Sequence, residues 1–320
     1  MPGVGRAYNV RVLRKISHVP RAEAAAAFAS VSVSALLMVV KFVAYYLTGA
    51  AAIFSDALES IVNVAAAAFA AYSLFLAHQP ADPEHPYGHG KVEFLSAGFE
   101  GGMILLAGIV IIGQAVLETV KPGGPTIGNL DAGLWLTVIA GGINALLGAF
   151  LVRSGKKQNS VALEADGKHL LSDAVTSVAV VLGLVVVKLT GWTYADPLAA
   201  FLVAIYIMRM GGGLLRHSAA GLMDEQDAED QKLLRRILDS HVGPSAKEPR
   251  ICSYHKLRFR HSGRYHWVDF HIMVPANWDI DHGHRVASSI EYEIEQALGE
   301  GNATAHVEPC ADEKCLACAK

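Results

Sequence analysis

Long apolar runs dominate the chain up to about residue 215, and charged residues gather beyond that point. A helix needs about 20 mostly apolar residues to cross the hydrocarbon core of a bilayer. Six segments reach this length, and each predicts a membrane-spanning helix. They cover residues 24–48, 52–77, 92–118, 131–152, 170–190 and 195–215. The first run is too long for the apolar core of a signal peptide, so we expect it to stay in the protein.

After Leu222 the pattern becomes that of a small soluble domain. Its expected elements are a helix over 226–241, strands over 251–261 and 265–274, a helix over 283–298 and a strand over 304–307. This αββαβ order is typical of an α+β sandwich of the ferredoxin-like or metallochaperone-like kind. The predicted fold is therefore an all-α six-helix transmembrane bundle followed by a C-terminal cytoplasmic α+β domain. The expected division is 1–21 as an N-terminal segment, 22–216 as the spans, 217–309 as the soluble domain and 310–320 as a cysteine-containing tail.

Composition and charge support this organisation. Charged residues make up 18% of the chain, against about 25% in soluble domains, and the net charge of −3 gives no basic stripe for nucleic acid. Most basic residues near the span ends fall on one side of the expected membrane, which the positive-inside rule assigns to the cytoplasm, and the opposite loops hold a single lysine, Lys121. The basic residues on the cytoplasmic side are Arg6, Arg11, Arg14, Lys15, Arg21, Arg153, Lys156, Lys157 and Arg216. We expect a multi-pass protein of the inner (plasma) membrane with both termini in the cytoplasm.

Four polar residues lie inside the predicted spans, where such groups are costly and mark function by default. Glu59 and Asn63 are four residues apart, as are His169 and Asp173, so each pair projects from one helix face. Together the two pairs offer four ligands, and a mixture of imidazole and carboxylate suits zinc and its neighbours. The alternative is that these groups form hydrogen bonds that hold the helices together.

The loop after the second span is rich in metal ligands. Asp82, His85 and His89 stand among prolines and glycines that let the backbone fold tightly around one ion. The alternative is a polar turn with solvated histidines.

Several of these segments resemble the cation diffusion facilitator family, in particular its bacterial zinc/iron-type metal/proton antiporters. The resemblance runs from about residue 11 to residue 309. It is carried by residues 41–59, the loop Pro-x-Asp-x-x-His-x-x-Gly-His-Gly-Lys over 80–91, the segment 169–173 and the segment 222–224. It implies a homodimer that exchanges a cytoplasmic divalent metal ion for protons by alternating access. A metal ion must displace protons from its ligands before it binds, which gives such coupling a physical basis. The chain has no Gly-x-x-x-x-Gly-Lys-Ser/Thr phosphate loop, and we expect a transporter rather than an enzyme.

The resemblance also implies that Glu59, Asn63, His169 and Asp173 form the transport site. Zinc-transporting members usually have His or Asp in place of Glu59 and Asp in place of Asn63. This chain therefore has one titratable carboxylate fewer, which makes a slightly larger or harder ion such as Mn²⁺ or Fe²⁺ more plausible. Zn²⁺ is the leading expectation, and Fe²⁺, Mn²⁺, Co²⁺, Ni²⁺ and Cd²⁺ are the alternatives, both as substrate and as regulatory ligand.

A second metal centre is expected in the soluble domain. By resemblance, the family's binuclear site at the dimer interface corresponds to His255, His271, His284, His306 and Glu308. The alternative is that the strand histidines only make hydrogen bonds in the sheet. Three further histidines are assigned to the surface, namely His261, His266 and His282.

Two further features are open to more than one interpretation. By resemblance, Lys91 and Asp224 match interlocking charges where membrane and cytoplasm meet, although a solvated surface pair is the alternative. The tail cysteines Cys310, Cys315 and Cys318 lie outside the resemblance. They are either soft ligands for an ion such as Zn²⁺ or an unligated end, because three ligands without a fourth make an incomplete structural site.

A membrane-anchored metal sensor is the competing function from a different class. A sensor has no need of ligands inside the membrane, so those four residues favour transport. A metallohydrolase is a poorer interpretation, because no nucleophile and base stand beside the histidines.

Overall fold

The computed structural model describes residues 19–48, 51–120, 131–192, 194–243, 246–311 and 315. The chain divides into two compact units, with the boundary between Ala219 and Ala220.

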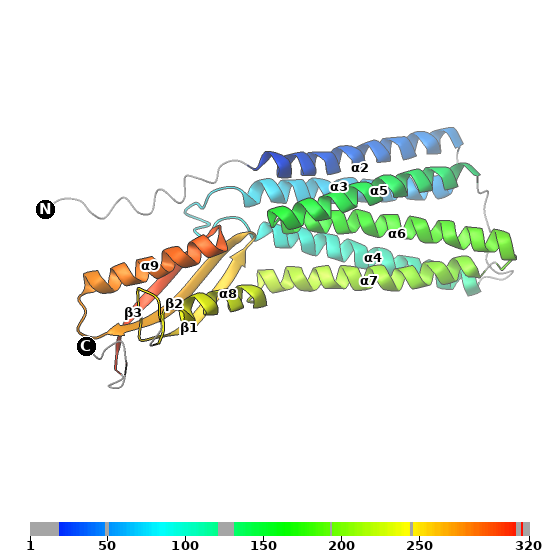
Figure 1. Ribbon diagram of the computed structural model, residues 1–320. Helices are drawn as coiled ribbons and strands as arrows, with labels where there is room; N and C mark the ends of the chain where they lie inside the picture. Colours follow the sequence, from blue (N-terminus) through cyan, green and yellow to red (C-terminus); the bar gives the residue numbers. More distant parts are fainter. Residues whose placement is uncertain are drawn as a thin grey trace. The chain divides into compact units, whose positions relative to one another are not determined.

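Six long helices fill the described part of the first unit, as the apolar runs predict. Figure 1 shows them side by side in a bundle. They are α2 (Arg21–Thr48), α3 (Ala51–Ala77), α4 (Val92–Val120), α5 (Asp131–Gln158), α6 (Val161–Thr190) and α7 (Ala195–Leu222). Each has 27 to 30 residues, and at 1.5 Å per residue this exceeds a hydrocarbon core of about 30 Å.

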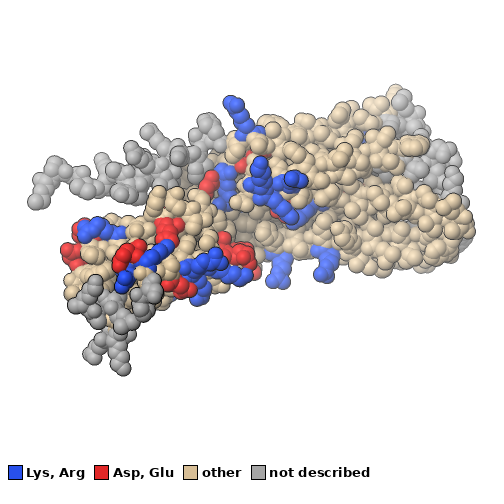
Figure 2. Space-filling model, viewed as in Figure 1, with Lys and Arg blue, Asp and Glu red and all other residues tan. Residues whose placement is uncertain are grey.

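The surface of this unit is apolar over most of its length. Leu36, Leu117, Leu146 and Leu189 each expose more than half of their surface, which is expected for side chains that face lipid. In Figure 2 most of the visible flank of the unit carries no Lys, Arg, Asp or Glu. Five of the described helices are long and apolar enough to cross a membrane. The remaining one, α6, carries four charged residues in its first half.

The start of α6 differs from the sequence prediction. The helix begins at Val161, whereas the apolar run predicted a start near residue 170. The first turns of α6 are polar, so an apolar run does not include them. Glu93 of α4 secures this start, since its Oε2 accepts hydrogen bonds from the Ser160 hydroxyl at 2.9 Å and the Ala162 N–H at 3.1 Å. Free N–H groups at a helix start need such partners, so the polar end of α6 is built into the bundle.

Glycines allow α5 and α6 to pack closely. A Cβ added at Gly167 would lie 2.6 Å from the Val152 backbone nitrogen and 2.8 Å from the Gly148 carbonyl oxygen. A Cβ added at Gly148 would lie 2.8 Å from the Gly167 carbonyl oxygen. Small residues at helix contacts are a usual source of close packing in membranes, and this contact fixes the half of α6 that carries His169.

The second unit has the predicted αββαβ order. Its elements are α8 (Ala228–Asp239), β1 (Ser253–Ser262), β2 (Tyr265–Pro275), α9 (Ile280–Leu298) and β3 (Gly301–Cys310). The sheet order is β1-β2-β3, with β1 antiparallel and β3 parallel to the central β2. The structure therefore confirms the expected combination of a helical membrane region and a small α+β domain.

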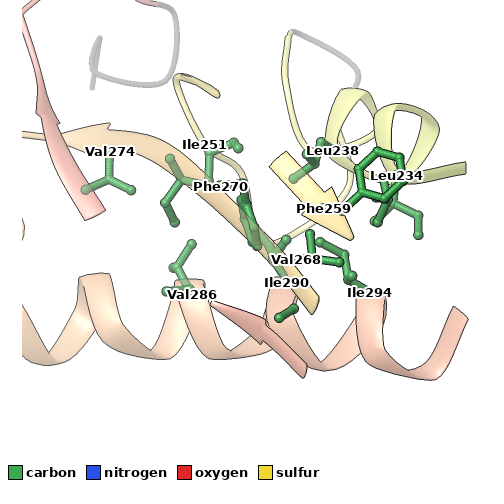
Figure 3. Packing of buried hydrophobic residues seen from close by; sticks show 14 residues of the cluster. Leu234, Leu238, Ile251, Phe259, Val268, Phe270, Val274, Val286, Ile290 and Ile294 are labelled. Carbon is green, nitrogen blue, oxygen red and sulfur yellow. The ribbon is translucent and has the colours of Figure 1, made fainter. Parts of the chain in front are cut away.

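One face of the sheet forms the core of the second unit. Figure 3 shows Ile290 and Ile294 of α9 near Val268 of β2, with Leu234 of α8 beside Phe259 of β1. Alternate residues of a strand point to opposite faces, and from Val268 to Val274 of β2 every second residue is buried while those between them are not. Both helices share this core, so the intervening residues of β2, including His271, belong to the opposite face.

Candidate metal centres

Three of the four residues predicted inside the membrane meet between α3 and α6. The Asn63 amide N–H donates a hydrogen bond to Asp173 Oδ2 at 2.8 Å. Its amide oxygen lies 3.1 Å from His169 Nε2, and because that oxygen can only accept, the imidazole donates through Nε2. His169 is buried, while Asn63 and Asp173 are partly buried. One amide, one imidazole and one carboxylate thus converge from two helices.

The fourth predicted residue, Glu59, lies on α3 one turn before Asn63. Its side chain is outside the residues whose side chains the structure describes. The four-residue spacing from Asn63 still places both residues on the same side of the helix.

The loop before α4 brings Asp82, His85 and His89 together as predicted from its composition. Asp82 Oδ1 accepts from the His85 backbone N–H at 2.6 Å and lies 3.0 Å from His85 Nδ1, while Oδ2 lies 3.3 Å from His89 Nε2. Partial burial acts to raise the pKa of Asp82, but the His85 hydrogen bonds and the two imidazoles outweigh it and lower that pKa. Gly88 adopts φ +79°, a conformation that favours glycine. The three donor groups lie within 4.8 Å of one another.

A row of imidazoles crosses the sheet of the second unit. His271 on β2 pairs with His255 on β1 and with His306 on β3, and the ring centroids are 5.1 Å and 4.8 Å from that of His271. Glu308 accepts from His271 Nδ1 at 2.8 Å and lies 3.2 Å from His255 Nε2. The hydrogen bond from His271 lowers the pKa of the Glu308 carboxyl. Donor atoms of His255, His271 and Glu308 lie within 4.8 Å of one another, close enough to fit one ion.

A β-bulge puts His255 into this row. Phe259 and Val268 are paired and buried, but His255 is four residues from Phe259 while His271 is three from Val268. Without an irregularity, strand alternation would send His255 to the core face. The extra residue near Lys256, which has φ +51°, reverses the alternation and brings His255 beside His271.

One predicted ligand lies apart from its cluster, and one predicted pair is divided between the two units. His284 is exposed on α9, and it does not belong to the cluster of His255, His271 and Glu308. Asp224 lies 3.5 Å from Arg260 of the same unit, whereas Lys91 belongs to the other unit. The charge interlock therefore stays a prediction.

One further cluster was not anticipated from the sequence. Asp230 of α8 lies 2.9 Å from His261 Nε2 and 3.3 Å from His266 Nε2, and both imidazoles are partly buried instead of lying at the surface. Their hydrogen bonds, His261 first, hold the pKa of Asp230 well below its usual range. The register of a hairpin turning at Ser262 and Gly263 pairs these two histidines, but the contribution of α8 could not be inferred from that hairpin.

Comparison with known proteins assigns both units. Residues 27–223 match the model of the cation efflux transmembrane domain, and residues 245–310 match that of the cation efflux protein cytoplasmic domain. The first match alone covers more than half of the chain. The protein belongs to the cation diffusion facilitator family. It is thus a cation efflux transporter and a multi-pass membrane protein, as the resemblance implied.

Relatives of this cation diffusion facilitator are similar along most of their length. The transporter sll1263 of Synechocystis sp. is 37% identical over 289 residues, which is 90% of this chain and 91% of that protein. The cation-efflux pump FieF of Shewanella oneidensis is 28% identical over 88% of this chain and 92% of its own length. A solved structure of CzrB in its zinc form is 26% identical and covers 28% of this chain and 94% of that chain, with a TM-score of 0.24.

Proposed function

We propose that this protein exports a divalent transition-metal ion from the cytoplasm in exchange for protons, with Zn²⁺ as the leading substrate and Fe²⁺ or Mn²⁺ as the main alternatives. It works as a homodimer in the inner membrane, with both termini in the cytoplasm, and moves the ion by alternating access. The observation that carries the proposal is the meeting of Asn63, His169 and Asp173 between α3 and α6.

The hydrogen bonds of this cluster suit a site that alternates between protons and metal. The metal-free groups hydrogen-bond to one another, which offsets part of the cost of placing polar atoms in a low-dielectric interior. A metal ion that binds His169 through Nε2 must displace the proton that Nε2 donates to Asn63. Protons and metal therefore compete for the same atoms, and a proton gradient can drive export.

The site in the soluble domain supports a regulatory role. The imidazole row lies on the face of the sheet opposite its helical core and offers His255, His271 and Glu308 to one ion. We propose that His306 and His284 complete a binuclear site when two protomers meet. Cytoplasmic metal then stabilises one dimer arrangement and shifts the transporter population toward it.

Transport is tested in liposomes with an imposed pH gradient, by measuring the uptake of each candidate ion in turn. We expect Zn²⁺ uptake that depends on the gradient and is lost in Asp173→Ala. The matched control is Glu164→Gln on the same helix, because Glu164 pairs with Lys168 at 2.8 Å instead of joining the cluster. Metal binding to the detergent-solubilised Asp173→Ala protein shows whether the soluble domain remains intact.

Two outcomes would contradict the proposal. If Asp173→Ala transports like the wild type, the cluster is a structural hydrogen-bond network. If the wild type binds metal but moves none across the membrane, the sensor interpretation replaces transport.

Substrate choice is tested at Asn63. Asn63→Asp restores the carboxylate that zinc-transporting relatives usually have, so we expect more protons exchanged per ion and a stronger preference for Zn²⁺ over Mn²⁺. The measurement is proton flux and metal flux in the same vesicles. An unchanged ratio would show that Asn63 is not a ligand.

A further inference from the structure

The chain has only four cysteines, and three of them meet in the second unit. The sulfur atoms of Cys252, Cys310 and Cys315 lie within 4.8 Å of one another. They come from separate parts of the chain, just before β1, at the end of β3 and in the segment beyond it. The fold thus brings Cys252 to two of the three tail cysteines.

The sheet holds two of these cysteines in place. The Cys252 N–H donates to the Met273 carbonyl of β2 at 2.8 Å, and its neighbour Ile251 is buried in the core. On the other side of β2, Cys310 pairs with Pro275 in the parallel ladder. The two cysteines therefore flank the same end of the central strand, and Cys315 reaches the same place.

From this arrangement we propose that Cys252, Cys310 and Cys315 bind a soft divalent cation of the Zn²⁺ or Cd²⁺ type as three of its four ligands, with water in the fourth position, so that the ion holds Cys315 beside the sheet. Thiolates at 2.3 Å from a tetrahedral zinc ion stand about 3.8 Å apart. The observed cluster, with sulfurs within 4.8 Å, needs to contract by about 1 Å at most. Soft thiolate ligands favour such ions over Mn²⁺.

This site is distinct from the imidazole row. Along β2 the row is centred on His271, and the cysteine cluster lies beside Pro275, four residues away. At about 3.3 Å per residue the two centres are about 13 Å apart. Thiolates and imidazoles of one sheet thus form two separate centres, and the cysteine site does not depend on whether the protein transports metal.

The test is Co²⁺ titration of the full-length, reduced protein in detergent, followed by displacement with Zn²⁺. Thiolate ligands give sulfur-to-cobalt charge-transfer bands in the near ultraviolet, whereas imidazole and carboxylate ligands do not. We expect these bands in the wild type and their loss on adding Zn²⁺. Cys252→Ser and Cys315→Ser are each expected to weaken the Co²⁺ affinity that these bands report by at least about tenfold, since loss of a direct ligand costs more than loss of a supporting partner.

Two controls keep the result interpretable. Ser253→Ala changes the neighbour of Cys252 without removing a thiol, and Cys318→Ser removes the fourth cysteine, whose position lies outside the described residues; both should keep the bands. The proposal is overturned if the reduced wild type binds Co²⁺ without these bands, or if they persist unchanged in both Cys252→Ser and Cys315→Ser. Complete loss in Cys318→Ser would also overturn the three-residue site.

Discussion

The close contact between α5 and α6 makes a quantitative prediction for Gly167→Ala. The added methyl would lie 2.6 Å from the Val152 backbone nitrogen, whereas ordinary contact begins at 3.4 Å. The difference means that the helices must separate by about 0.8 Å, because a backbone atom cannot turn aside as a side chain can. Such overpacking costs about 1–3 kcal/mol.

A matched glycine separates packing from helix propensity. Gly142 lies on α5, the partner helix of this contact, but a Cβ there would meet nothing within 4 Å. Gly142→Ala should stabilise the helix by up to about 1 kcal/mol, because alanine has a higher helix propensity than glycine. Gly167→Ala has the same gain in helix propensity, but the clash destabilises the protein. The difference between the two variants therefore measures the packing contribution of about 1–3 kcal/mol.

We expect metal transport to change in parallel with stability in the two glycine variants. Gly167 precedes His169 by two residues, so a displaced α6 lengthens the 3.1 Å contact between His169 and Asn63. We expect a lower Tm in detergent and a reduced metal flux in liposomes for Gly167→Ala, with Gly142→Ala close to wild type in flux. Equal Tm values for the two variants would refute the close α5–α6 contact.

Three further predictions concern single residues. The depressed pKa of Asp230 means that its carboxylate stabilises the folded state above the unfolded pKa near 3.8. The raised pKa of His266 means that its imidazole stabilises the folded state below pH 6.5, and this stabilisation is lost as pH rises through the raised pKa. Thermal unfolding should therefore show that Asp230→Asn costs about 1 kcal/mol at pH 5 to 6 after allowance for screening, and a flat difference from pH 5 to 9 would contradict this. Lys256→Gly should stabilise the soluble unit by roughly 1 kcal/mol, because a non-glycine residue at φ +51° is strained. Deletion of Lys256 should instead turn His255 to the core face and weaken metal binding. Calorimetry measures both effects, and unaltered metal binding in the deletion variant would argue against the bulge. Glu93→Gln should lower the Tm by replacing one acceptor oxygen at the start of α6 with an amide NH₂ group, and an unchanged Tm would show that this cap is dispensable.

The sequence alone determined the arrangement of elements along the chain. Six apolar runs of membrane-spanning length predicted α2 to α7, and a change to alternating and amphipathic patterns predicted the αββαβ unit. Hydropathy and periodicity are local properties of a segment, so they can be recognised in the sequence without knowing which elements the segment packs against. For the same reason the sequence did not predict the start of α6. Its first turns are polar, and Glu93 of another helix accepts a hydrogen bond there.

Only the tertiary structure decided how ligands from different elements come within reach of one another. Asn63 reaches His169 and Asp173 across more than 100 residues of sequence, and a single extra residue in β1 turns His255 toward His271. Cys252 joins the tail cysteines because β1 and β3 flank the same strand. Spacing along one element indicates which side chains share a face, whereas the distance between two elements depends on how their small residues, bulges and strand register let them pack.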